Sequence, residues 1–224
     1  MTQMNPPGAA VFGWPLVWSL PMLPYRALGG PLDPDVAYGF GLVVSLAANC
    51  VSVVATAYAG FYATGRRAVG LAAATTFALW PLLVGLIGGE RSWENGTWAV
   101  DAGLVMYTEP VSTALVTTAL ALLLSPRSCG LRLALAGLAL GFATAVRLSN
   151  GLLLAVALLV LVASLGVRRT LPYLAGAVAF APLIAVYWPK GYAREELFPD
   201  DPFALDYATQ AWADSLLQSY RTPA

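Results

Sequence analysis

Six long apolar segments, separated by short polar connections, determine what this chain can fold into. A bilayer core about 30 Å thick is crossed by about 20 apolar helical residues, because a spanning helix satisfies its backbone hydrogen bonds internally. The segments that approach this length are residues 36–62, 68–88, 108–124, 131–146, 150–165 and 171–188. They predict an all-α, polytopic transmembrane helix bundle with about six spanning helices.

The composition excludes several other classes of protein. Of the 224 residues, 58% are hydrophobic and 11% are charged, whereas soluble domains carry about 25% charged residues. Twelve basic residues balance twelve acidic ones, and histidine is absent. These counts exclude a basic nucleic-acid-binding surface and any histidine-centred metal or acid–base chemistry.

Both ends of the chain differ from the central segments. Three prolines interrupt the apolar run 9–28, so we expect an interfacial or re-entrant segment there, with a kinked spanning helix as the alternative. We expect residues 1–188 to form the transmembrane domain and residues 189–224 to form a non-cytoplasmic, amphipathic, interfacial tail. The fourth and fifth apolar segments are short, and a re-entrant pair is the alternative for them.

The arginines predict the orientation in the membrane. Three short connections each carry two arginines and no acidic residue. They contain Arg66 and Arg67, Arg127 and Arg132, and Arg168 and Arg169. By the positive-inside rule these connections face the cytoplasm, and all twelve carboxylates then fall on the opposite side. We therefore expect an integral membrane protein with its acidic loops external.

Two acidic features on the external side are candidates for chemistry. The predicted loop 89–98, which includes Trp93 and Glu94, mixes carboxylates with aromatic rings, as a sugar-binding surface does. An interfacial loop with tryptophan anchors is the alternative. In the sequence Tyr107-Thr108-Glu109-Pro110, a carboxylate stands at the start of an apolar segment. Such a charge is costly unless it meets a helix N-terminus, a cation or a watery cavity, and structural capping alone would explain it.

Arg147 is the third candidate, because it stands between two short apolar segments on the external side. Its planar guanidinium can bind two phosphate oxygens, and the helix that follows adds N-terminal amides. The alternatives are that the side chain reaches the membrane interface or that it pairs with Glu109.

The order of these motifs resembles that of the type C integral membrane glycosyltransferases, which use a polyprenyl-phosphate-linked sugar as donor. Residues 5–8 (Asn-Pro-Pro-Gly) are similar to the family's Pro-Pro segment, and residues 107–110 to its acidic-Pro motif. Residues 141–150 are similar to the stretch that ends in Thr-Arg or Thr-Lys before the next helix. The resemblance implies sugar transfer on the external side of a bacterial plasma membrane.

The resemblance also implies roles for individual residues. Arg147 would contact the donor phosphate, and Glu109 would be a polar partner of the donor, the acceptor or a divalent metal. Tyr107, Glu94 and Trp93 would complete the substrate-binding set. The implied partners are membrane lipids, the polyprenyl-phosphate sugar donor and further membrane helices or subunits, with no nucleic acid.

One departure from the family concerns the N-terminus. In the family, a first helix and an external loop with the catalytic aspartate precede the Pro-Pro segment, whereas residues 1–4 precede it here. We therefore expect a fragment, or a remnant that is inactive alone, and assign no catalytic residue. A small membrane transporter or a non-catalytic membrane subunit is the alternative function, although the paired halves typical of transporters are not evident in the sequence.

Overall fold

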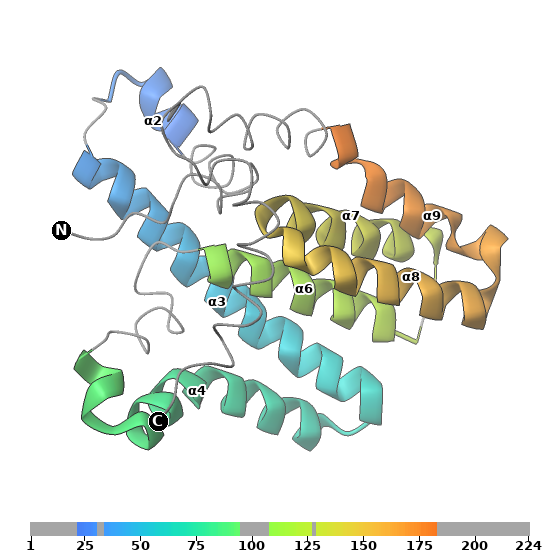
Figure 1. Cartoon of the computed structure of the whole chain (residues 1–224), viewed down its shortest axis with the longest axis horizontal. Helices are drawn as coiled ribbons and strands as arrows, with labels where there is room; N and C mark the ends of the chain where they lie inside the picture. The colour runs from blue at the N-terminus through green and yellow to red at the C-terminus, as the bar shows by residue number, and fades with distance from the viewer. Residues whose placement is uncertain (1–21, 31–33, 95–107, 127–128, 183–224) are drawn as a thin grey trace, which may run out of the picture.

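The computed structural model describes residues 22–30, 34–94, 108–126 and 129–182, and its regular elements there are all helical (Figure 1). They are α2 (Met22–Ala27), α3 (Pro34–Thr64), α4 (Arg67–Glu94), α6 (Thr108–Leu124), α7 (Gly130–Val146), the 3-10 turn η1 (Leu148–Asn150), α8 (Gly151–Leu165) and α9 (Val167–Val178). The prediction of an all-α fold is confirmed for this part of the chain. Most of the predicted N-terminal interfacial segment and the whole predicted tail 189–224 lie outside the described residues.

Two helices are long and apolar enough to cross a membrane. They are Gly39–Thr64 within α3 and Arg67–Ile87 within α4, with 26 and 21 residues. Helices α6, α7 and α8 have 17, 17 and 15 residues, which at about 1.5 Å per residue falls short of a hydrocarbon core about 30 Å thick. Two helices thus have the length and composition that a span requires, and the six spans themselves stay a prediction.

The C-terminal part of α4 corrects the predicted loop 89–98. The helix continues through the polar residues after Gly88 and ends at Glu94, so residues 89–94 are helical rather than part of a loop. The prediction followed the loss of hydropathy after Gly88, but a helix can leave an apolar environment and continue, because glutamate and arginine are good helix formers. The remainder of the predicted loop lies outside the described residues.

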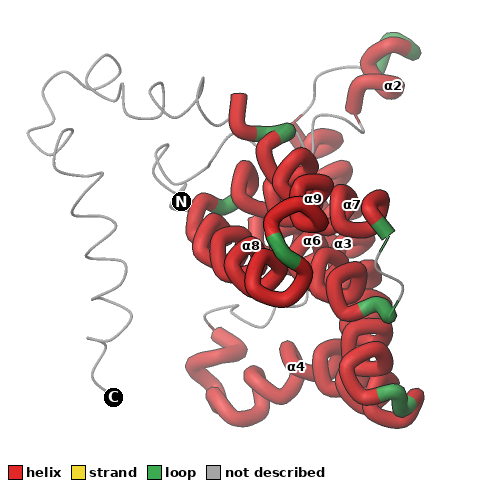
Figure 2. The backbone as a smooth tube through the Cα atoms, turned by 90° about the vertical axis from the view of Figure 1, so that its right-hand side faces the viewer, coloured by secondary structure: helices red, strands yellow, loops and turns green. Residues whose placement is uncertain are grey.

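Close helix contacts through glycine hold the bundle together. A Cβ atom added at Gly137 of α7 would overlap the carbonyl oxygen of Tyr173, and one added at Gly176 of α9 would overlap that of Ala134. Such backbone-to-backbone approach is typical of helices packed within membranes. Around this contact, α6 packs on α7, α8 packs on α9, and α3 joins α6 to α4 (Figure 2).

The outer faces of the helices are apolar. Exposed large side chains include Ile87 of α4, Leu131 of α7 and Leu152 of α8, and α8 has no buried residue. In the most apolar windows of α3 and α4, 28% and 22% of residues are buried inside the protein. The core helix of a soluble protein would be mostly buried, so these exposed apolar faces are typical of helices surrounded by lipid.

The connections that carry the arginines lie at one end of the bundle. The ends of α3, α6 and α8 and the starts of α4, α7 and α9 all lie at the right in Figure 1. The start of α6 and the end of α7 lie toward the opposite end. The described arginines of these connections therefore share one end, as predicted, while Arg127 lies outside the described residues and the membrane side stays a prediction.

Cysteine labelling tests which side of the membrane each end faces. Cys129 is an exposed thiol at the arginine end. A Cys50→Ala variant keeps Cys129 as its one thiol, so labelling of that variant reports on the arginine end. A Cys50→Ala, Cys129→Ala, Glu94→Cys variant reports on the end of α4. In intact cells we expect a membrane-impermeant maleimide to label position 94 at once and Cys129 only after permeabilisation. The reverse order would contradict the predicted orientation.

Candidate functional site

Glu109 stands in the first turn of α6, where the local sequence suits a carboxylate. The helix begins at Thr108, and Pro110 follows Glu109 directly. Proline is tolerated there because the first N–H groups of a helix have no partner within the helix. The positive end of the helix dipole also favours a negative side chain in this turn. The helix start therefore holds Glu109 at the end of the bundle opposite the arginine connections.

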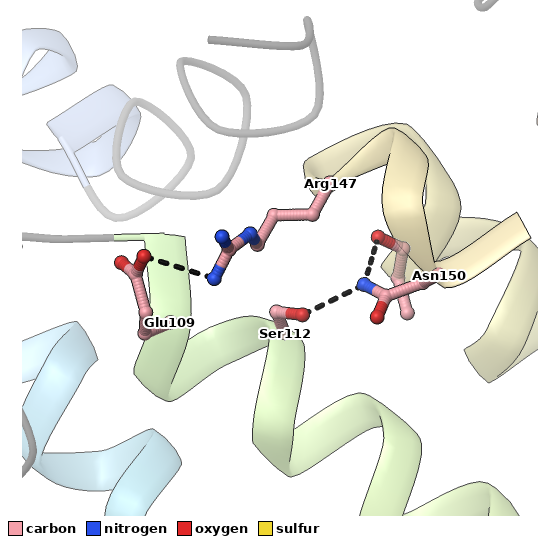
Figure 3. Close-up of polar contacts among 5 residues, drawn as sticks. Glu109, Ser112, Arg147 and Asn150 are labelled. Atoms are coloured by element: carbon pink, nitrogen blue, oxygen red, sulfur yellow. Dashed lines mark hydrogen bonds and ion pairs between the residues drawn. The ribbon is translucent and has the colours of Figure 1, made fainter. Parts of the chain in front are cut away.

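Arg147 occupies the break between α7 and α8. Its backbone is extended (φ −142°, ψ 114°), and its N–H donates to the carbonyl oxygen of Ala143. The side chain reaches from the end of α7 toward the start of α6, as Figure 3 shows, and Nη1 lies 2.9 Å from Oε1 of Glu109. The structure thus brings two of the five predicted site residues together. It also confirms the pairing of Arg147 with Glu109.

Exposure determines how much this ion pair contributes to stability. The Arg147 and Glu109 side chains are 44% and 37% exposed. Water screens a pair of this kind, so its contribution is about 0–1 kcal/mol. Within the described part of the chain, the guanidinium of Arg147 uses Nη1 on Glu109 and has its other donors available. The pair therefore presents a half-exposed cation rather than a structural bridge.

A second polar contact lies beside the ion pair and was missed from the sequence. Asn150 donates through Nδ2 to Oγ of Ser112 at 2.7 Å and to the carbonyl oxygen of Ala143 at 2.9 Å (Figure 3). Ser112 follows Glu109 by one helical turn, and Asn150 follows Arg147 by the same interval. The two side-chain contacts therefore form parallel links between α6 and the α7–α8 break. That shared three-residue spacing is the sequence signal from which the second link could have been predicted, but it was not used.

Apolar residues support the polar site from within the bundle. Val111 of α6 and Val146 of α7 belong to one buried cluster with Ala48 of α3. Val146 is fully buried and directly precedes Arg147. Packing therefore fixes the end of α7 just where the arginine leaves the helix.

The other predicted site residues are not brought to this pair by the described structure. Trp93 and Glu94 belong to the last turn of α4, and the positions of their side chains are outside what the structure describes. Tyr107 lies outside the described residues. The described site therefore consists of Glu109, Ser112, Arg147 and Asn150.

The described residues do not form a donor set for the divalent metal that the family resemblance left open. In the described part of the chain, no three or more acidic, cysteine or histidine side chains gather as metal ligands would. Glu109 supplies one carboxylate, and that group already pairs with Arg147. We therefore derive no step through a metal.

Comparison with known proteins adds no family assignment to this geometry. The case for function consequently rests on the chemistry of the four site residues and on the apolar bundle that carries them. No protein-family model, curated protein or solved structure matches the chain.

Proposed function

We propose that this chain is an integral membrane protein of the glycosyltransferase type, which binds a polyprenyl-phosphate-linked sugar at the end that carries Arg147. The observation that carries the proposal is the half-exposed guanidinium of Arg147 at a helix break in an apolar bundle. The exposed apolar faces of α3 and α4 support membrane insertion, since lipid is the solvent that such faces match. The order of the sequence motifs supports the glycosyltransferase type.

The chemistry of Arg147 suits a phosphate headgroup. A guanidinium offers several N–H donors in one plane, and charge-assisted bonds to phosphate oxygens are among the stronger hydrogen bonds in proteins. Arg147 follows α7 directly, so it stands where an apolar helix ends. A lipid-linked phosphate lies at the same boundary, because its prenyl chain stays in the hydrocarbon layer.

Glu109 has two uses in this proposal. Its carboxylate is the counter-ion of the guanidinium, at 2.9 Å, and a carboxylate oxygen can accept hydrogen bonds from sugar hydroxyls. In sugar transfer of this type, an acidic residue removes the proton of the acceptor while cations stabilise the departing phosphate. We assign the phosphate contact to Arg147 and leave the acceptor base unassigned.

A binding comparison with two ligands tests the proposal. We expect the purified protein in nanodiscs to bind a polyprenyl monophosphate about tenfold more tightly than the polyprenol of the same chain length, a difference of about 1.4 kcal/mol. The two ligands share their apolar tail, so the ratio reports the phosphate alone. Equal affinities would contradict phosphate recognition and leave the transporter or non-catalytic subunit as the better account.

A further inference from the structure

We infer that Asn150 is a positioning residue, which holds Arg147 in register with Glu109 by linking α6 to the α7–α8 break. The inference rests on the proposed function, because it concerns how the phosphate-binding arginine is presented. It assigns Asn150 a role other than that of a helix cap. Four hydrogen bonds and the burial of Ser112 support this role.

Asn150 stands at the N-cap of α8 but does not cap that helix. An asparagine at this position commonly accepts a hydrogen bond from an amide of its own first turn. Here the residue has helical backbone angles (φ −69°, ψ −13°) and makes no side-chain cap bond. Its amide donates instead to Ser112 in α6 and to Ala143 in α7. The side chain thus connects three consecutive helices.

The same hydrogen-bond acceptor joins Asn150 to the backbone of Arg147. The carbonyl oxygen of Ala143 accepts from the Arg147 N–H at 2.8 Å and from Nδ2 of Asn150 at 2.9 Å. The Asn150 N–H donates in turn to the carbonyl oxygen of Arg147 at 3.0 Å. These three bonds close the short segment that carries the arginine. Two of these bonds join backbone groups, and the third comes from the side-chain amide of Asn150. Removal of that side-chain amide therefore leaves the two backbone bonds and deletes the third.

The link to Ser112 sets the register along α6. Ser112 lies one turn beyond Glu109, and its side chain is buried, with 6% of the residue exposed. A buried hydroxyl is costly to leave without its hydrogen bond, whereas the half-exposed ion pair has a weak preference for one geometry. The Asn150–Ser112 bond is partly buried and ends on a buried hydroxyl, so it is the contact that keeps the two ends of the ion pair opposite each other.

Zero-length crosslinking measures the register directly. In an Arg147→Lys variant, a carbodiimide joins Glu109 to the lysine amine when the two groups are in contact, and mass spectrometry detects the joined peptides. We expect this crosslink in Arg147→Lys and its loss when Asn150→Ala is added. Ser112→Ala should reduce the yield, and Ser112→Thr, which keeps the hydroxyl, should restore it. No crosslink in Arg147→Lys alone would contradict the contact on which the inference rests.

Thr144→Val is the matched control. Thr144 is also buried near the end of α7, but its hydroxyl donates to Leu140 within its own helix and links no second helix. A general loosening of α7 would lower the crosslink in Thr144→Val as well. We expect Thr144→Val to keep the crosslink. Full crosslinking in Asn150→Ala, or in Ser112→Ala, would overturn the positioning role.

Ligand binding then separates this inference from the proposed function. With Arg147 intact, we expect Asn150→Ala to lower the affinity for the polyprenyl monophosphate about tenfold and Thr144→Val to leave it unchanged. If the unsubstituted protein binds no phosphate while the crosslink still depends on Asn150, the proposed function fails and the positioning role holds. If phosphate binds and the crosslink persists without Asn150, the positioning role fails.

Discussion

Replacing Gly137 with alanine lowers the thermal stability of the bundle, whereas the same replacement at Gly39 does not. Both glycines lie inside helices, where alanine is favoured over glycine by about 1 kcal/mol. Among the residues that the structure describes, a Cβ atom at Gly39 of α3 meets no atom within 4 Å. One at Gly137 of α7 overlaps the backbone carbonyl of Tyr173 in α9. A backbone atom cannot rotate away, so α7 and α9 must move apart.

The change in stability of Gly137→Ala follows from two opposing contributions, the helix preference for alanine and the overlap of its Cβ atom with the α9 backbone. Overpacking of a close contact costs about 1–3 kcal/mol, and separation of α7 from α9 also loosens the cluster around buried Tyr173. We expect a lower melting temperature for Gly137→Ala and an unchanged or higher one for Gly39→Ala, measured by circular dichroism in the same detergent. Gly137→Leu should have the larger effect. A melting temperature of Gly137→Ala equal to that of the unsubstituted protein would contradict the α7–α9 contact.

This contact also shows what the sequence alone predicts and what it does not. Hydrophobic segments located the helices well, and α6 has the predicted bounds of 108–124. The sequence also shows Gly137 and Gly141 four residues apart, but spacing along one helix does not identify the helix that packs on it. That choice depends on contacts between segments distant in the chain, which local periodicity does not report.

The candidate site was predictable to a similar extent. Glu109 was singled out because a charge at the start of an apolar segment is costly. Arg147 was singled out because it stands between two short apolar segments, and its pairing with Glu109 was one of the stated alternatives. Ser112 was not singled out from the sequence, because a serine in an apolar helix commonly forms a hydrogen bond to the backbone of its own helix. Asn150 before a helix likewise predicts a cap. In the structure, tertiary contact overrides both local preferences.

Arg147→Ala removes the preference for the phosphate ligand over the neutral prenol. The substitution deletes the cation and leaves the Glu109 carboxylate in place, so the site loses the charge that attracts the phosphate. A hydrogen bond to a charged group contributes about 1.5–3 kcal/mol, and we therefore expect an affinity loss of about 10- to 100-fold for the polyprenyl monophosphate. Arg147→Lys keeps the positive charge but loses the planar set of N–H donors. Its phosphate affinity should lie between that of the unsubstituted protein and that of Arg147→Ala.

Arg66→Ala is the control for overall charge. It also removes one exposed arginine, but from the turn between α3 and α4 at the opposite end of the bundle. We expect its phosphate affinity to equal that of the unsubstituted protein. An equal loss in both variants would show that the ligand responds to net charge rather than to the site.

Glu109→Gln changes the phosphate affinity in the opposite direction to Arg147→Ala, and it separates the two uses of the Glu109 carboxylate. With its counter-ion neutralised, Arg147 attracts phosphate more strongly, and for a half-exposed pair we expect a gain of about three- to tenfold for the sugar-free polyprenyl monophosphate. If Glu109 also accepts hydrogen bonds from the sugar, the gain shrinks for a sugar-linked phosphate, because the amide replaces one acceptor oxygen with a donor. Weaker binding of both ligands would instead mean that Glu109 holds Arg147 in the only geometry that binds phosphate. Comparison of the two ligands in this one variant therefore distinguishes a competing counter-ion from a substrate-binding carboxylate.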